Sequence, residues 1–143
     1  MKNFDFTDQD ITYRMVAENE HAFAFLNKMP ILPGHTLICP KRPIALSEEI
    51  TLEVWADLLK LKEVVCDKLK KALHVKGFNF AWNEGSIAGQ TVPHFHLHIV
   101  PRKENDQGIT QYEPRLFLYR PGSRADFPKQ ELTILSKELR KIV

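Results

Sequence analysis

The sequence predicts a single α+β domain built on an antiparallel sheet. Three observations support it: strand-like segments dominate the first part of the chain, one long helical pattern follows, and strand-like segments return after it. This order is typical of a fold whose strands meander and whose helices pack on the sheet. The length of 143 residues suits one domain with its own hydrophobic core, and we expect it to span residues 1–143.

The strands expected before the helix are short. Ile11, Tyr13 and Met15 alternate with polar residues, and residues 22–26 form a second apolar run. The third segment, residues 35–39, is closed by prolines on its C-terminal side. We therefore expect two strands between residue 11 and residue 26, followed by a third.

The main helix is expected over residues 51–73, with Thr51 as its N-cap and Gly77 as a stop. A second helix is expected over residues 129–143, where leucines recur at spacings of three and four. Apolar side chains of the main helix recur at helical spacing and share one face. They are Trp55, Leu58, Leu59, Val65, Leu69 and Leu73.

The chain after the main helix returns to strands. Residues 78–82 alternate, with the aromatic residues on one face, and we expect Phe80 and Trp82 in the core. A glycine-containing loop over residues 83–91 leads into the next strand. Residues 103–126 are polar and are predicted to be irregular.

The composition is that of an ordinary soluble domain, with 43% hydrophobic and 27% charged residues. A formal net charge of +2 is too small to favour a duplex-binding surface, so no nucleic acid partner is expected. The start of the chain lacks the pattern of a secretory signal, and no stretch approaches a membrane span. We therefore expect a cytoplasmic protein with no membrane partner. Cys39 and Cys66 are expected to be small buried hydrophobes.

Three histidines alternate with apolar residues directly after the loop. In an extended strand, side chains two residues apart share a face, so His94, His96 and His98 are predicted to line one surface. Phe95 and Leu97 then point to the opposite face and into a core. Three imidazoles in a row gain nothing obvious as packing, because each carries two ring nitrogens that need partners. The run therefore indicates a functional site.

The histidines and the loop before them suit phosphate chemistry. A neutral imidazole is a nucleophile toward phosphorus, and a neighbouring imidazolium can donate a proton to a leaving group. Gly85 and Gly89 can expose backbone N–H groups to phosphate oxygens, and Ser86, Gln90 and Thr91 add donors. We expect phosphoryl or nucleotidyl transfer rather than acyl transfer. The three histidines alone fit a zinc, copper or iron site equally well.

Three segments of the chain carry a family resemblance. Residues 94–100 read HFHLHIV, and this run resembles the signature of the histidine triad (HIT) superfamily. The run LPGHTLICPKR at residues 32–42 and AGQTV at residues 88–92 resemble the branch named for the fragile-histidine-triad protein, whose members hydrolyse dinucleoside polyphosphates. The resemblance extends from about residue 27 to residue 102 and places the metal interpretation well behind the nucleophile.

The resemblance implies a role for each matching residue. His96 would attack the α-phosphate of a purine nucleotide, and water would resolve the nucleotidyl-histidine and release AMP. His98 would contact the phosphate and help protonate the leaving group, while His94 and His35 would complete the histidine network. The implied substrate-binding residues are Asn27 for the ribose, Asn83, Gln90 and Thr91 for the phosphates or leaving group, and Phe25 and Leu37 for the base.

The resemblance also implies an architecture and partners. The fold would be a five-stranded antiparallel sheet with helices, and the protein a homodimer in which the main helices pack together and the sheets run on as one. No tightly bound cofactor is implied, although a divalent cation such as Mg²⁺ can enter with the substrate phosphates. His98 stands where the nucleotide-sugar transferase branch has glutamine, which favours hydrolysis.

Two alternatives stay open within this resemblance. Asn83 opens a segment that looks more like the nucleoside-phosphoramidase branch, so a purine nucleoside phosphoramidate is the alternative substrate. The protein could also be a nucleotide-binding sensor whose hydrolysis is slow. His21 and His74 stand outside the matching motifs, and we interpret them as surface or structural residues.

Overall fold

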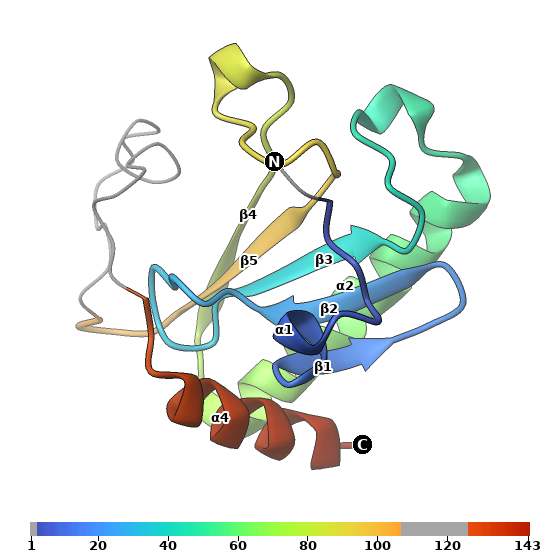
Figure 1. Cartoon of the computed structure of the whole chain (residues 1–143). Coiled ribbons are helices and arrows are strands. Elements are labelled where there is room, and N and C mark those ends of the chain that lie inside the picture. The colour runs from blue at the N-terminus through green and yellow to red at the C-terminus, as the bar shows by residue number, and fades with distance from the viewer. Residues whose placement is uncertain (1–2, 107–125) are drawn as a thin grey trace.

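The computed structural model describes residues 3–106 and 126–143 (Figure 1). Its centre is a five-stranded antiparallel sheet with the strand order β1-β2-β3-β5-β4. The strands are β1 (Met15–Glu18), β2 (Ala22–Leu26), β3 (Thr36–Pro40), β4 (Gly77–Ala81) and β5 (Leu97–Arg102). The prediction of an α+β fold with a five-stranded antiparallel sheet is confirmed. Most of the segment predicted to be irregular, residues 103–126, lies outside the described residues.

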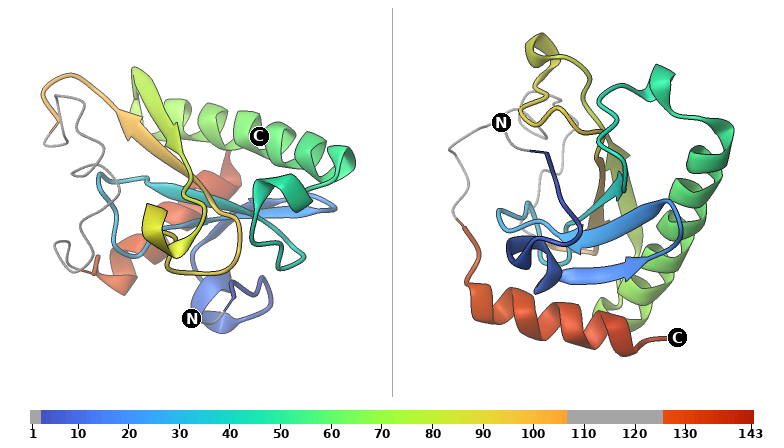
Figure 2. Two further views of the ribbon diagram at one scale, coloured as in Figure 1. Left: turned by 90° about the horizontal axis from the view of Figure 1, so that it is seen from above. Right: turned by 45° about the vertical axis from the view of Figure 1, so that its right-hand side comes forward.

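Helices lie on both sides of the sheet. Viewed from above, α2 (Leu52–Leu73) covers one face, while the short helix α1 (Gln9–Thr12) lies on the other (Figure 2). The C-terminal helix α4 (Lys129–Lys141) packs against β1 and α2 (Figure 1). Short 3₁₀ turns occur at Ser47–Glu49 and Ser86–Ala88. No helix within the described ranges is long and apolar enough to cross a membrane.

Strand β2 is buried along its whole length because both of its faces are covered. Ala22, Ala24 and Leu26 belong to the core beneath α2, whereas Phe23 and Phe25 pack on the opposite face with residues of the N-terminal segment. Side chains of a strand alternate between faces, so a fully apolar run is what a doubly covered strand requires. The core therefore consists of two layers separated by the sheet.

The first predicted strand is wrong at its start. Ile11 lies in the helical turn α1, whose N-cap Asp8 accepts a hydrogen bond from the backbone N–H of Asp10. Tyr13 caps that turn, and the strand begins only at Met15. Three alternating residues fit one helical turn as well as a strand, and the Asp8 cap favours the turn.

The main helix confirms its predicted cap at Thr51 and its predicted end at Leu73, but Gly77 is not the residue that stops it. Thr51 caps α2 by accepting a hydrogen bond from the Val54 N–H at 3.3 Å. The helix is capped by His74, which adopts the left-handed conformation with φ of 55°, and Gly77 instead opens β4. Leu59 is 53% exposed and does not belong to the buried face.

The aromatic residues of β4 are less buried than predicted. Phe80 and Trp82 are each 42% exposed, so the expectation that they lie in the core is wrong. β4 is an edge strand, and its outer side has no neighbouring strand among the described residues. Trp82 follows the end of β4 and packs against Trp55 and Phe95, with ring centroids 5.9 and 5.3 Å away.

Candidate active site

One row of residues crosses the sheet on the face away from α2. Phe25 of β2 lies opposite Leu37 of β3, and Leu37 lies opposite His98 of β5. Met15 and Ala81 extend this row to the two outer strands. Cross-strand neighbours of this kind have side chains within contact distance. The register therefore places Leu37 directly beside His98, and Phe25 on the far side of Leu37, so both residues predicted to bind a base lie in the row of His98.

The predicted strand of alternating histidines is wrong in its extent. β5 begins at Leu97, so His94 lies in a bend before it and His96 immediately precedes the ladder. The rings of His96 and His98 nevertheless lie together, with centroids 5.1 Å apart. Phe95 is buried on the opposite side among aromatic residues near α2. His96, His98 and Phe95 therefore keep the predicted alternation between the two faces, although the strand itself is shorter.

His35 and His98 form a hydrogen-bonded pair whose protons can be assigned. The backbone N–H of Ile31 donates to Nδ1 of His35 at 3.0 Å, so this nitrogen carries no proton. The ring proton of neutral His35 is then on Nε2, which donates to Nδ1 of His98 at 2.9 Å. His98 consequently holds its own ring proton on Nε2.

The ring protons of His94 and His96 can be assigned in the same way. The backbone N–H of Phe4 donates to Nδ1 of buried His94 at 3.1 Å, and His94 Nε2 donates to the Pro40 carbonyl at 2.7 Å. The His94 carbonyl accepts from Nδ1 of His96 at 2.8 Å. Nε2 of neutral His96 therefore keeps its lone pair. Burial lowers the pKa of His96 and that of His94 below the ordinary range, which favours the neutral rings.

These hydrogen bonds also bear on the metal interpretation. A metal ligand must offer a ring nitrogen with a lone pair. The Nδ1 lone pair of His94 is taken by the Phe4 N–H, and its Nε2 donates to Pro40. His94 therefore has no nitrogen to offer, and a three-histidine metal site on this run does not fit the structure.

The glycine-containing loop is fastened to the segment before α2, and both rise from the same end of the sheet (Figure 1). Gln90 accepts a hydrogen bond from the Gly85 N–H at 2.8 Å and donates to the Ala45 carbonyl at 3.0 Å. Phe95 adds a backbone bond to Ile44. The Gln90 amide thus closes the loop, a role that its position in the sequence did not reveal.

Of the remaining predicted residues, Asn27 contacts one of the histidines directly. Asn27 follows β2, donates its backbone N–H to the His35 carbonyl at 2.8 Å, and accepts the Met29 N–H on its side chain. Gly89 ends the short 3₁₀ turn with φ of 97°, a conformation that favours glycine. Asn83 is half-buried and Thr91 exposed, at the two ends of the loop.

The N-terminal segment reaches the site, which the sequence did not predict. The Phe4 ring lies 5.2 Å from Phe25 and 5.3 Å from His96, measured between centroids. Buried Arg14 supports Phe25 from another side, with its guanidinium carbon 5.0 Å from the ring centre. No local motif marks Phe4, because its partners are distant in the chain. The sequence itself shows only two phenylalanines at alternate positions, Phe4 and Phe6.

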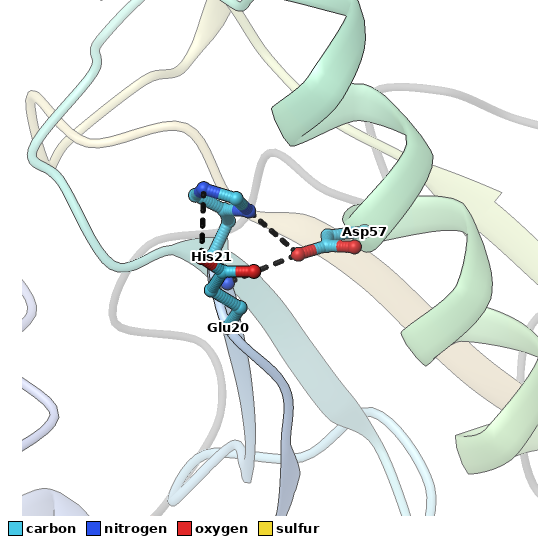
Figure 3. A group of neighbouring side chains, drawn as sticks. All are labelled: Glu20, His21 and Asp57. Carbon is cyan, nitrogen blue, oxygen red and sulfur yellow. Dashed lines mark hydrogen bonds and ion pairs between the residues drawn. The ribbon is translucent and has the colours of Figure 1, made fainter.

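His21 forms a cluster with Glu20 and Asp57, in keeping with a structural role (Figure 3). Asp57 of α2 accepts hydrogen bonds from the ring Nδ1 of His21 at 2.7 Å and from its backbone N–H at 3.1 Å. Glu20 and Glu53 lie 4.0 and 3.9 Å from His21 Nε2. The hydrogen bond to Asp57 raises the pKa of His21 and lowers that of Asp57. The cluster ties the β1–β2 turn to the main helix.

Comparisons with known proteins agree with this architecture. The chain is 45% identical over 106 residues to an uncharacterized HIT-like protein of Mycoplasma genitalium, covering 73% of this chain and 74% of that protein. It is 40% identical over 87 residues to the bis(5'-adenosyl)-triphosphatase of Dictyostelium discoideum, covering 61% of this chain and 58% of that protein.

A solved structure and a family match complete the comparison. A hypothetical histidine triad nucleotide-binding protein from Sulfolobus tokodaii has a TM-score of 0.72 and 30% identity, covering 90% of this chain and 81% of that chain. Residues 8–105 match the HIT domain. This range spans more than half of the chain and includes all four histidines of the site. The chain is therefore a member of the HIT family.

Proposed function

We propose that the protein hydrolyses dinucleoside polyphosphates, such as diadenosine tri- or tetraphosphate, at the α-phosphate and releases AMP. The observation that carries the proposal is the hydrogen-bond pattern of neighbouring rings, from which their protons are assigned. His96 keeps a lone pair on Nε2, while His98 holds a proton on its own Nε2. A nucleophile and a donor thus lie side by side, with ring centroids 5.1 Å apart.

The chemistry follows from that arrangement. Nε2 of His96 attacks the α-phosphorus, a P–N bond forms, and the P–O bond to the rest of the polyphosphate breaks. The leaving phosphate departs as an anion, whose developing charge is stabilised by the N–H of His98. Water then attacks the same phosphorus, the P–N bond breaks, AMP leaves, and the water proton passes to solvent. His96 returns to its neutral form.

The neighbouring residues support a nucleotide as substrate. Phe25 and Leu37 lie in one row with His98 and would lie next to the base, although both side chains are buried and Phe25 packs against Phe4. Asn27 lies beside His35, and its side-chain N–H₂ would bind the ribose hydroxyls. Gly89 and Thr91 at the loop would meet the phosphates, and Asn83 would meet the leaving group. Gln90 would act by holding this loop. Mg²⁺ would enter with the substrate phosphates rather than as a resident cofactor.

The direct test is mass spectrometry of the intact protein, quenched during reaction with diadenosine triphosphate. A transient gain of one AMP mass that maps to His96, with AMP and ADP released, supports the proposal. His96→Ala should form no adduct and should still bind nucleotide. His21→Ala is the matched control, because this ring bonds to Asp57 instead, and it should react like wild type. An active His96→Ala variant would contradict the nucleophile assignment.

A purine nucleoside phosphoramidate is the second candidate substrate. Asn83, at the start of the loop, motivates it through the resemblance to the phosphoramidase branch. Comparing kcat/KM for a phosphoramidate and a dinucleotide in one preparation separates the two. Tight binding with a kcat far below the range of about 1–10³ per second would instead favour the nucleotide sensor.

We also propose that the protein is a homodimer. The exposed edge of β4, together with the half-exposed rings of Phe80 and Trp82, supports an interface there. Sedimentation equilibrium gives the mass directly. The proposal predicts twice the chain mass for wild type and the chain mass for Phe80→Glu, and a monomeric wild type would contradict it.

A further inference from the structure

The N-terminal strap, residues 3–8, is tied to the triad by one long-range hydrogen bond. The backbone N–H of Phe4 donates to Nδ1 of His94 at 3.1 Å, across a sequence separation of 90 residues. The Phe4 ring packs beside the same histidine, with centroids 5.8 Å apart, and edge-on to His96 at 5.3 Å. A backbone donor and an aromatic ring of one residue thus converge on the two histidines.

The strap is held in place by contacts of its own. Asp5 accepts hydrogen bonds from the Thr7 N–H at 2.8 Å and the Thr7 hydroxyl at 2.6 Å. The Phe6 ring lies 5.6 Å from Phe23 and 4.9 Å from the Lys41 ammonium. These contacts fix the path of the backbone near Phe4 before any substrate is bound.

We propose that Phe4 is a positioning residue whose backbone N–H, together with the Pro40 carbonyl, selects the protonation form of His94 and thereby that of the nucleophile. This inference rests on the proposed function for its effect on turnover. A neutral imidazole carries one ring proton, which can sit on either nitrogen. The Phe4 N–H occupies the Nδ1 lone pair and leaves the proton on Nε2, where it donates to the Pro40 carbonyl.

Loss of the Phe4 donor would disturb His96 through the backbone. If the proton of His94 moved to Nδ1, the Nε2 lone pair would face the oxygen of Pro40 at 2.7 Å, which is repulsive. The ring and its backbone would have to shift. The carbonyl of His94 is the acceptor for Nδ1 of His96, so the same shift would weaken the bond that keeps the lone pair of His96 on Nε2.

The structure offers matched variants. Phe4→Pro removes the N–H, while Phe4→Ala keeps it and removes the ring. Asn3→Pro places a proline one residue earlier, at an exposed position whose N–H has no hydrogen bond among the described residues. We expect kcat to fall about tenfold or more in Phe4→Pro, with kcat little changed in Asn3→Pro. Phe4→Ala should retain the protonation form of His94.

The decisive readout is nitrogen NMR of the histidine side chains, because it needs neither substrate nor turnover. In wild type we expect a bare Nδ1 and a protonated Nε2 on His94, with a scalar coupling from the Phe4 amide nitrogen to Nδ1 across the hydrogen bond. Phe4→Pro should populate both protonation forms of His94. A protonated Nδ1 in wild type, or an unchanged His94 spectrum in Phe4→Pro, would overturn the inference. Correct NMR signatures without a nucleotidyl adduct would instead refute only the proposed function.

Discussion

Nε2 of His35 lies 2.9 Å from Nδ1 of His98, although the two residues are separated by 63 positions in the sequence. The bond joins the residue just before β3 to the second residue of β5, and these two strands pair directly. Because Ile31 supplies a backbone N–H to the other nitrogen of His35, the direction of the bond is determined. The proton of His98 is therefore positioned by the fold.

Replacing His35 should lower turnover more than substrate affinity. His35→Ala leaves the Ile31 N–H and the His98 ring without their shared partner, so kcat should fall about tenfold or more and stability by roughly 1–3 kcal/mol. His35→Gln retains an N–H donor, so its kcat should lie between that of wild type and that of His35→Ala. Steady-state kinetics and urea unfolding measure both effects. Equal kcat values in the two variants would argue against a donor role.

The pH dependence of kcat/KM should reflect the burial of His96. Burial lowers its pKa below the ordinary value of 6.5, so the neutral nucleophile persists as the pH falls to that value. We expect the acid limb of the kcat/KM profile to have its midpoint below pH 6.5. A buffer series from about pH 4 to 8, with salt held constant, measures it. A midpoint above 6.5 would show that a different group limits the reaction.

Gly34 should tolerate no side chain, in contrast with Gly77. Gly34 has φ of 92°, and an added Cβ would lie 2.7 Å from Cδ1 of Leu73 and 3.1 Å from Cγ of Pro101. Gly34→Ala should destabilise the protein by roughly 1–3 kcal/mol from backbone strain alone, with the clash added to it. Gly77→Ala is the control, because nothing lies within 4 Å of its Cβ position. Similar unfolding midpoints for the two variants would contradict this contrast.

Local patterns predicted the site better than they predicted its surroundings. The histidine run was recognisable because its residue types suit a reaction, and its alternation put Phe95 in the core as the structure has it. The same alternation overextended the strand. The backbone N–H of Phe95 bonds to Ile44 in another loop instead of to a neighbouring strand, and no local pattern encodes that choice of partner.

Contacts between segments that are distant in the sequence account for the other differences between the predicted and the observed structure. Phe80 fits a strand that could lie in the middle of a sheet or at its edge, and only the strand order places it at the edge. Phe4 and Gln90 resemble ordinary apolar and polar residues, yet one bonds to His94 and the other closes a loop onto Ala45. Their roles depend on contacts with residues that are distant in the sequence, and the periodicity of a short segment does not reveal such contacts.

The His21–Asp57 pair should give stability a pH dependence that is independent of catalysis. The hydrogen bond between them raises the pKa of His21 above 6.5, so its contribution is fully present below about pH 6.5 and is lost as the pH rises through the raised value. The pKa of Asp57 is lowered below 3.8, so its contribution is present above about pH 3.8 and is lost as the pH falls through the lowered value. Both contributions to stability are therefore present together at mildly acidic pH.

The expected signature is a difference in Tm between wild type and His21→Ala that is larger near about pH 5 than near about pH 8. Asp57→Asn should show the same loss of pH dependence, because the amide can still accept the backbone N–H of His21 but holds no charge opposite its ring. Differential scanning calorimetry at the two pH values measures this, and activity at pH 8 reports whether the triad is intact. A Tm difference that does not change with pH would mean that the pair acts through its hydrogen bonds alone, without the charge on His21.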